Sequence, residues 1–120
     1  MREIEARTIQ QAVRDLLLEA SYVIGDDIAC AVDEALKAEP SPGGREVLSQ
    51  IRENYQIARE ERVAICQDTG MAVVFLAVGQ DVHIVGGDLD AAVNKGVRQA
   101  YSEGYLRKSV VKDPLFDRAN

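Results

Sequence analysis

The stretch VAICQDTGMAVVFLAVGQDVHIV, residues 63–85, decides the fold, because the spacing of apolar residues changes here. Residues 71–78 form an unbroken, valine-rich apolar run, which is typical of a strand buried on both faces. A short Gly-Gln-Asp connection follows, and residues 82–85 predict a second strand that pairs with the first as a hairpin. The preceding residues have helical spacing, so the sequence predicts a mixed α/β (α+β) chain.

Three helices are expected before this stretch. From about residue 2 to residue 24, apolar residues recur at helical spacing with charged residues between them. Asp26 or Asp27 is positioned to cap a second helix, which ends before Pro40. Ser41 followed by Pro42 is a start signal for a third helix, because proline fits the first turn.

A fourth helix is expected after the strands. Gly86 and Gly87 break the strand pattern, Asp88 is positioned as a cap, and Gly104 ends the helix. The predicted architecture is therefore helical over residues 1–62 and strand–loop–helix over residues 63–120. Two strands are too few for a free-standing sheet. We therefore expect residues 1–120 to form a single partial domain of a longer protein.

The composition argues against several classes of protein. Of 120 residues, 14 are Lys or Arg and 20 are Asp or Glu, which gives a net charge of −6. This acidic balance does not favour nucleic-acid binding or docking on an anionic membrane. The longest apolar run is far shorter than the span of about 20 residues that a membrane requires. The charged N-terminus does not resemble a signal peptide, and the two cysteines then indicate a reducing compartment without a disulfide framework.

The segment richest in chemistry is Cys-Gln-Asp-Thr-Gly at residues 66–70. Loops on a rigid scaffold often carry reactive groups, and Gly70 allows a ligand to approach the backbone closely. A thiolate at Cys66 would ligate a soft metal centre or act as a nucleophile. From these residues alone, a turn with a buried, inert Cys66 is the more ordinary interpretation.

Several blocks in a fixed order favour the functional interpretation. They are CQDTG at residues 66–70, the apolar run, GQDVHI at residues 79–84, the Gly-Gly pair at 86–87, and GYLRKSVV at residues 104–111. In order and spacing the chain resembles the class I fumarate hydratases, a family of iron–sulfur hydro-lyases that includes the L(+)-tartrate dehydratases. The resemblance covers essentially the whole chain. It corresponds to the N-terminal part of the alpha subunit in two-subunit members.

The resemblance implies a role for four residues. Cys66 would be one of three cysteine ligands of a [4Fe–4S] cluster, since such clusters take thiolate ligands. Gln67 and Asp68 would line the substrate pocket beside the iron that lacks a protein ligand. Asp68 would orient or help to deprotonate a hydroxyl or water. Arg107 would hold a substrate carboxylate, because its guanidinium is a rigid fork of donors.

The implied activity is the reversible hydration of fumarate to (S)-malate, with L(+)-tartrate dehydration as the alternative. The implied partner is a beta subunit, the substrate is a small dicarboxylate, and homo-oligomer formation stays open. The family's other two cysteine ligands would lie beyond residue 120. We therefore expect a truncated or short alpha subunit that alone neither holds a complete cluster nor turns over substrate. The competing hypothesis is a non-catalytic interaction module. Because an exposed iron is vulnerable to oxygen, the resemblance also implies an anaerobic or protected cytoplasmic setting.

Structural roles are expected for the other candidate residues. Cys30 is expected to be packed within the second helix. Thr69 is expected to steady its loop, and His83 to be a strand residue with a local hydrogen bond. Gly86-Gly87-Asp88 lacks the longer glycine pattern of a dinucleotide site, so a phosphate cradle is not favoured. Packing roles are expected for the tyrosines Tyr101 and Tyr105.

Overall fold

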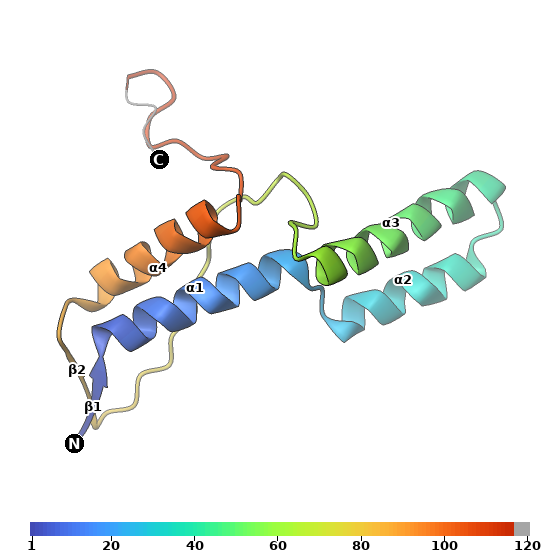
Figure 1. Cartoon of the computed structure of the whole chain (residues 1–120). Coiled ribbons are helices and arrows are strands. Elements are labelled where there is room, and N and C mark those ends of the chain that lie inside the picture. The colour runs from blue at the N-terminus through green and yellow to red at the C-terminus, as the bar shows by residue number, and fades with distance from the viewer. Residues whose placement is uncertain (117–120) are drawn as a thin grey trace. The chain divides into compact units, whose positions relative to one another are not determined.

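The computed structural model describes residues 1–116, in which the elements follow the order β1, α1, α2, α3, β2, α4. The chain divides into two compact units (Figure 1). Unit 1 comprises Met1–Glu19 and Cys66–Asn120, and unit 2 comprises Ala20–Ile65. Among the helices formed by residues 1–116, none is both long enough and apolar enough to span a membrane.

The sheet of unit 1 confirms the mixed α/β class but corrects the predicted strand pairing. Strand β1 (Arg2–Glu5) lies where the start of the first helix was expected, and β2 (Val82–Val85) pairs with it in parallel. The predicted hairpin between residues 71–78 and 82–85 is therefore wrong. Strand β1 is hard to recognise because Arg-Glu-Ile-Glu has one apolar residue, Ile4, which is half-buried between exposed glutamates.

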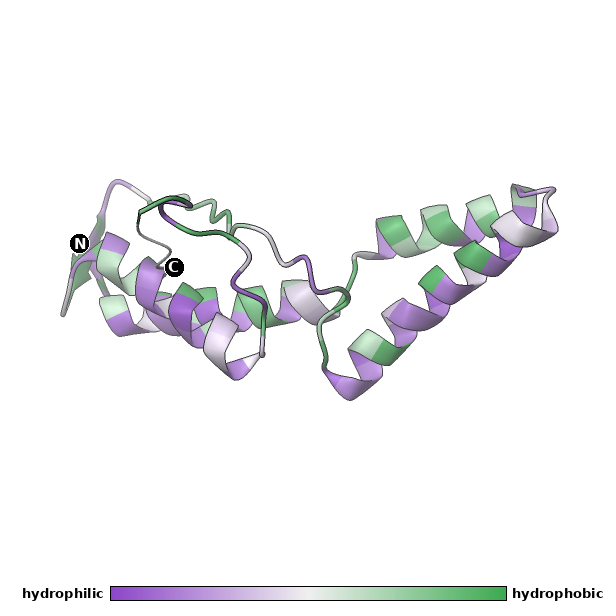
Figure 2. Cartoon of the chain, turned by 90° about the horizontal axis from the view of Figure 1, so that it is seen from above, coloured by the Kyte–Doolittle hydropathy of each residue, from purple (hydrophilic) through white to green (hydrophobic). Residues whose placement is uncertain are grey.

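The apolar run at residues 71–78 is not a strand, which is a second correction. Within it, Phe75 is 92 % exposed, Met71 73 % and Val73 69 %. Residues 63–65 are likewise irregular. A continuous apolar strand is stable only when neighbours cover both of its faces, and residues 1–116 supply no such cover. In Figure 2, much of the irregular connection between the last helix of unit 2 and β2 is coloured as hydrophobic.

Two helices of unit 1 pack closely through small residues. Helix α1 spans Ala6–Tyr22, of which the residues up to Glu19 belong to unit 1, and α4 spans Leu89–Glu103. A Cβ atom added at Gly96 of α4 would lie 2.5 Å from the carbonyl oxygen of Gln10 and 2.9 Å from Cβ of Val13. Only glycine therefore allows this approach of the two backbones. The contact buries residues on both helices: Ala6, Val13, Ala92 and Ala100.

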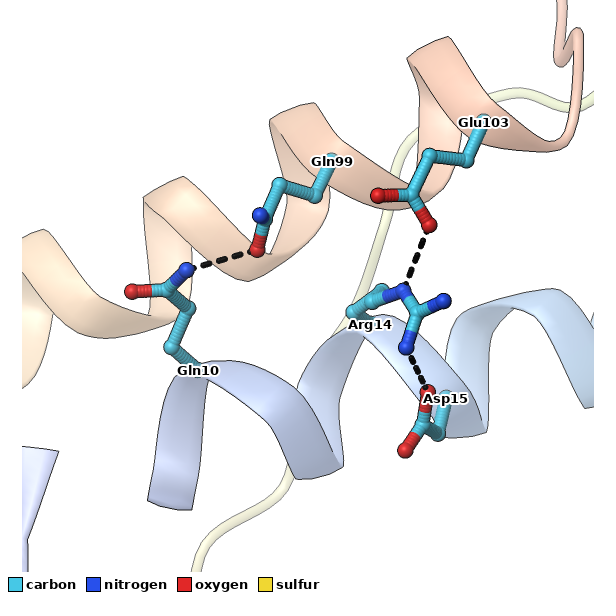
Figure 3. A network of polar contacts seen from close by, with 5 residues as sticks. All are labelled: Gln10, Arg14, Asp15, Gln99 and Glu103. Atoms are coloured by element: carbon cyan, nitrogen blue, oxygen red, sulfur yellow. Dashed lines mark hydrogen bonds and ion pairs between the residues drawn. The ribbon is translucent and has the colours of Figure 1, made fainter. Parts of the chain in front are cut away.

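Side-chain polar contacts join the same two helices (Figure 3). Gln10 Nε2 donates to Gln99 Oε1 at 2.6 Å, and Arg14 Nε donates to Glu103 Oε2 at 2.6 Å. The hydrogen bond and the negative charge of Glu103 raise the pKa of Arg14 above its ordinary value. Both pairs join residues 89 positions apart, so α1 and α4 run in the same direction.

Both predicted ends of α4 are confirmed. Asp88 Oδ1 accepts a hydrogen bond from the Ala91 amide at 2.9 Å, which caps the first turn. The Gly104 amide donates to Ala100 O at 2.8 Å and closes the last turn. The next residue, Tyr105, takes the left-handed conformation with φ 52°, and the chain turns there into residues 106–111.

Unit 2 is built around two helices, α2 (Asp26–Ala38) and α3 (Pro42–Glu61). The predicted start of α3 is confirmed, because Ser41 Oγ accepts from the Gly44 amide at 2.9 Å and Pro42 is the first helical residue. Helix α2 begins at Asp26 with Gly25 as its N-cap and no side-chain cap, so the expected cap at Asp26 or Asp27 is wrong. Cys30 is exposed, which contradicts its expected packing, since α2 buries none of its residues.

Candidate functional site

The predicted cluster ligand lies on an exposed loop. Cys66, Gln67 and Asp68 are all exposed, and the Cys66 thiol donates to the carbonyl oxygen of Asp68 at 3.6 Å. The expectation of a buried Cys66 in this segment is therefore wrong. Gly70 closes the loop in the left-handed conformation, with φ 57°, which glycine adopts without strain.

Thr69 joins this loop to the segment that carries Arg107. Its hydroxyl donates to the Arg107 carbonyl oxygen at 2.6 Å, across 38 positions of sequence. The same carbonyl also accepts from the Ser109 amide at 3.0 Å and from the Ser109 hydroxyl at 3.4 Å. The expected role of Thr69 in steadying the loop agrees with this bond. The backbones that carry Gln67, Asp68 and Arg107 are thereby held together.

Tyr101, on the last turn of α4, joins the same two segments. Its hydroxyl lies 3.2 Å from the carbonyl oxygens of both Thr69 and Gly70. Its own carbonyl accepts from the Leu106 amide at 3.0 Å. The sequence indicated packing for Tyr101 and missed this polar role. No sequence signal could have shown it, because the acceptors are main-chain carbonyls, which every residue has.

Arg107 follows a buried anchor. Leu106 is only 5 % exposed, whereas Arg107 itself is exposed. Residues that alternate in this way fix the backbone and leave the guanidinium accessible to a ligand. The structure therefore brings together, through the backbone, the two segments on which all four predicted site residues lie.

A groove of 550 Å³ lies beside these segments, between residues 70–74, α4 and residues 108–110. Its walls carry apolar side chains together with the cations Arg98 and Lys108. The predicted substrate residues Gln67, Asp68 and Arg107 do not line it. The groove and the predicted site are therefore neighbours that share the Gly70 backbone and Tyr101.

Two other candidates lie away from this loop. His83 is exposed on β2, opposite Glu3 of β1. At the Gly86-Gly87 turn, the Glu5 carboxylate lies so close to Gly86 that an added Cβ would collide with it. A carboxylate in that position would repel an anion that approached this turn.

The side chains that could bind metal show whether the described residues supply a complete set of cluster ligands. Iron–sulfur clusters need several thiolate ligands, and three protein ligands leave one iron open. Within residues 1–116, no group of three or more His, Cys, Asp or Glu side chains could hold a metal ion. The other cysteine, Cys30, belongs to unit 2. The exposed Cys66 thiol thus fits one ligand position, and the described residues do not supply a complete site.

Comparison with known proteins identifies the family. The family model described as "Fumarate hydratase (Fumerase)" matches residues 10–120. The chain is 36 % identical over 106 residues to the "Putative L(+)-tartrate dehydratase subunit alpha" of Methanocaldococcus jannaschii, covering 86 % of this chain and 36 % of that protein. It is 39 % identical over 97 residues to the aerobic class I fumarate hydratase of Escherichia coli K12, covering 80 % and 18 % respectively.

A third relative is the L(+)-tartrate dehydratase subunit alpha of Escherichia coli K12, 28 % identical over 95 residues, with 79 % of this chain and 30 % of that protein covered. The chain thus spans little more than a third, or less, of the length of these relatives. The family model nevertheless extends from α1 through the loop at residues 66–70 to the segment that carries Arg107. On this evidence the chain belongs to the fumarate hydratase (Fumerase) family.

Proposed function

We propose that this chain forms the N-terminal part of the alpha subunit of a [4Fe–4S]-dependent hydro-lyase that reversibly hydrates fumarate to (S)-malate. The main support is the bond of 2.6 Å between Thr69 Oγ1 and Arg107 O. It joins two distant segments that present an exposed thiol, amide, carboxylate and guanidinium. These are the groups that a cluster ligand and a dicarboxylate site require.

Each side chain has a chemical role in this proposal. Cys66 binds through its thiolate as one ligand, and the cluster, when bound, supplies a Lewis acid for a substrate oxygen. Gln67 hydrogen-bonds to the substrate through its amide. Asp68 holds the proton of the substrate hydroxyl or of the attacking water. Arg107 pairs with a substrate carboxylate and fixes its orientation.

The remaining parts of the catalytic unit must come from outside these residues. We propose that a beta subunit assembles with the alpha subunit, as the names of two relatives indicate for those proteins. The 120-residue chain alone, with Cys66 as its one ligand in unit 1, is then expected not to hold a stoichiometric cluster. Anaerobic reconstitution with iron and sulfide tests this. A stable cluster absorbance at one cluster per chain would contradict the proposal that the remaining ligands lie outside this chain.

The cysteine pair provides a matched experiment in the complete enzyme. Cys66→Ser is expected to abolish fumarate hydration and to lower the bound iron, because serine is a poor ligand for iron–sulfur clusters. Cys30→Ser is the control, since Cys30 is also exposed but lies on α2 in unit 2. Equal activity of the two variants would remove Cys66 from the ligand set.

The substrate is tested by assaying the same enzyme with fumarate, (S)-malate and L(+)-tartrate. Relatives with both kinds of name match this chain, so tartrate dehydration is the second candidate. Arg107→Ala is expected to lower kcat/KM on the order of 100-fold for the true substrate, mainly by raising KM, because a charge-assisted contact to the carboxylate is lost. An unchanged KM and kcat would reject this role for Arg107.

A further inference from the structure

We infer that Tyr101 is a positioning residue that fixes the loop carrying Gln67 and Asp68 relative to Arg107. This inference rests on the proposed function, because it assigns a task to a residue that contacts neither substrate nor cluster in that proposal. The phenolic hydroxyl of Tyr101 is then required for full activity, although it does not touch the reacting atoms.

The first step in the argument is that Tyr101 holds both segments at once. Its hydroxyl lies 3.2 Å from the carbonyl oxygens of Thr69 and Gly70, so its single proton is shared between two consecutive peptide groups. Its main-chain carbonyl accepts from the amide of Leu106, the residue before Arg107, at 3.0 Å. One residue therefore contacts each segment directly.

The second step is that the contacts close into a ring. Thr69 Oγ1 donates to Arg107 O at 2.6 Å, which joins the two segments to each other. Tyr101, Thr69 and the backbone at Leu106-Arg107 then form a closed triangle of hydrogen bonds. A loop fixed at two points has far fewer orientations than a loop fixed at one, so both corners are needed to hold Asp68 in one position.

The third step is that Tyr101 itself is held in place by the packing of α4. Tyr101 is half-buried and follows Ala100, which is fully buried where α4 packs on α1. Gly96, one turn earlier, fixes that packing through its contact with Gln10 O. By contrast, Gln67 and Asp68 are exposed and have no such packing of their own. Their position therefore depends on the contacts of the Tyr101 and Thr69 hydroxyls.

The decisive variant is Tyr101→Phe in the complete enzyme. The ring and its packing stay, and the hydroxyl is lost. We expect kcat to fall about 10- to 100-fold with KM changed less than about 3-fold, because small misplacements of catalytic groups are costly to the rate. Tyr105→Phe is the matched control: Tyr105 is 90 % exposed and its hydroxyl has no hydrogen-bond partner within residues 1–116.

Thr69 supplies an independent variant if Tyr101→Phe disturbs folding. Thr69→Val keeps the shape and loses the bond to Arg107 O, so it is expected to reproduce the fall in kcat. Thr69→Ser keeps a hydroxyl and is expected to retain more activity than Thr69→Val. A fall of equal size in both Thr69 variants would count against positioning through this bond.

A double variant separates positioning from a general structural effect. If Tyr101 acts through Asp68, then Tyr101→Phe with Asp68→Asn is expected to lose no more activity than Asp68→Asn alone. Additive losses, or a Tyr101→Phe enzyme as active as Tyr105→Phe, would overturn the inference. Retained activity in Cys66→Ser and Asp68→Asn would instead overturn the proposed function, so the two failures are distinguishable.

Discussion

The two helix pairs of this chain pack in different ways. In unit 1, α1 and α4 approach so closely at Gly96 that no Cβ fits, and side-chain bonds of 2.6 Å join them. In unit 2, α2 buries none of its residues, α3 buries only Ala58, and the ion pair between Arg52 and Asp33 is 3.6 Å long. The closer pair is the one that carries Tyr101, so the predicted site depends on the more tightly packed unit.

Among the variants that compare the two helix pairs, Gly→Ala substitutions are expected to differ most in their effect on the free energy of unfolding. Gly96→Ala places a Cβ against backbone and is expected to destabilise the chain by about 1–3 kcal/mol, even after the gain in helix propensity. Gly43→Ala in α3 meets nothing within 4 Å and is expected to stabilise it by up to about 1 kcal/mol. Urea unfolding of the 120-residue chain measures both. A neutral Gly96→Ala would show that α1 and α4 can separate without cost.

The left-handed residues that follow α4 and α3 are expected to give a smaller difference in stability, of the opposite sign. Tyr105 and Arg62 both have left-handed backbones, with φ 52° and 55°. Tyr105→Gly is expected to stabilise the chain by about 0.5–1 kcal/mol, because glycine adopts this conformation freely. Arg62→Gly is expected to gain less, because the Arg62 guanidinium lies 4.9 Å from the centre of the Tyr22 ring and that attraction is lost. Thermal unfolding compares the two, and a larger gain for Arg62→Gly would refute the argument.

Removing the arginine from one ion pair in each unit is expected to give the smallest difference in stability. Arg14→Met removes the bond to Glu103 and is expected to lower stability more than Arg52→Met, whose pair with Asp33 is longer. Because all four groups are partly exposed, the difference is expected to shrink in about 1 M salt. Urea titrations with and without salt measure this. A difference unaffected by salt would mean that the short hydrogen bond between Arg14 and Glu103, rather than the screened attraction of their charges, accounts for it.

The sequence predicted a contact correctly when the two residues that form it are close together along the chain. The Ser41 and Asp88 caps were predicted correctly, because each bonds an amide only three residues ahead. Strand β1 was missed, because its partner β2 lies some 80 residues further along the chain. The apolar run at residues 71–78 was misassigned, because a strand needs neighbours that its own pattern cannot specify.

In the candidate site, some residues could be predicted from the sequence and the bonds between their segments could not. Resemblance to a family pointed to Cys66, Gln67, Asp68 and Arg107, and their roles stay predictions. The bonds that join their segments could not be read from the sequence, because Thr69 and Tyr101 donate to main-chain oxygens. A side chain does not indicate its partner when that partner is a main-chain oxygen more than 30 residues away, whereas a cap finds its amide three residues ahead.

The parallel pairing of β1 with β2 has a consequence for biosynthesis. Arg2 leaves the ribosome about 80 residues before its partner Val82. At 5–20 residues per second, β1 therefore waits roughly 4–16 s before its sheet can form. The α2–α3 hairpin is contiguous in sequence and emerges complete during that interval. The nascent chain must thus keep its first helix soluble until translation delivers α4.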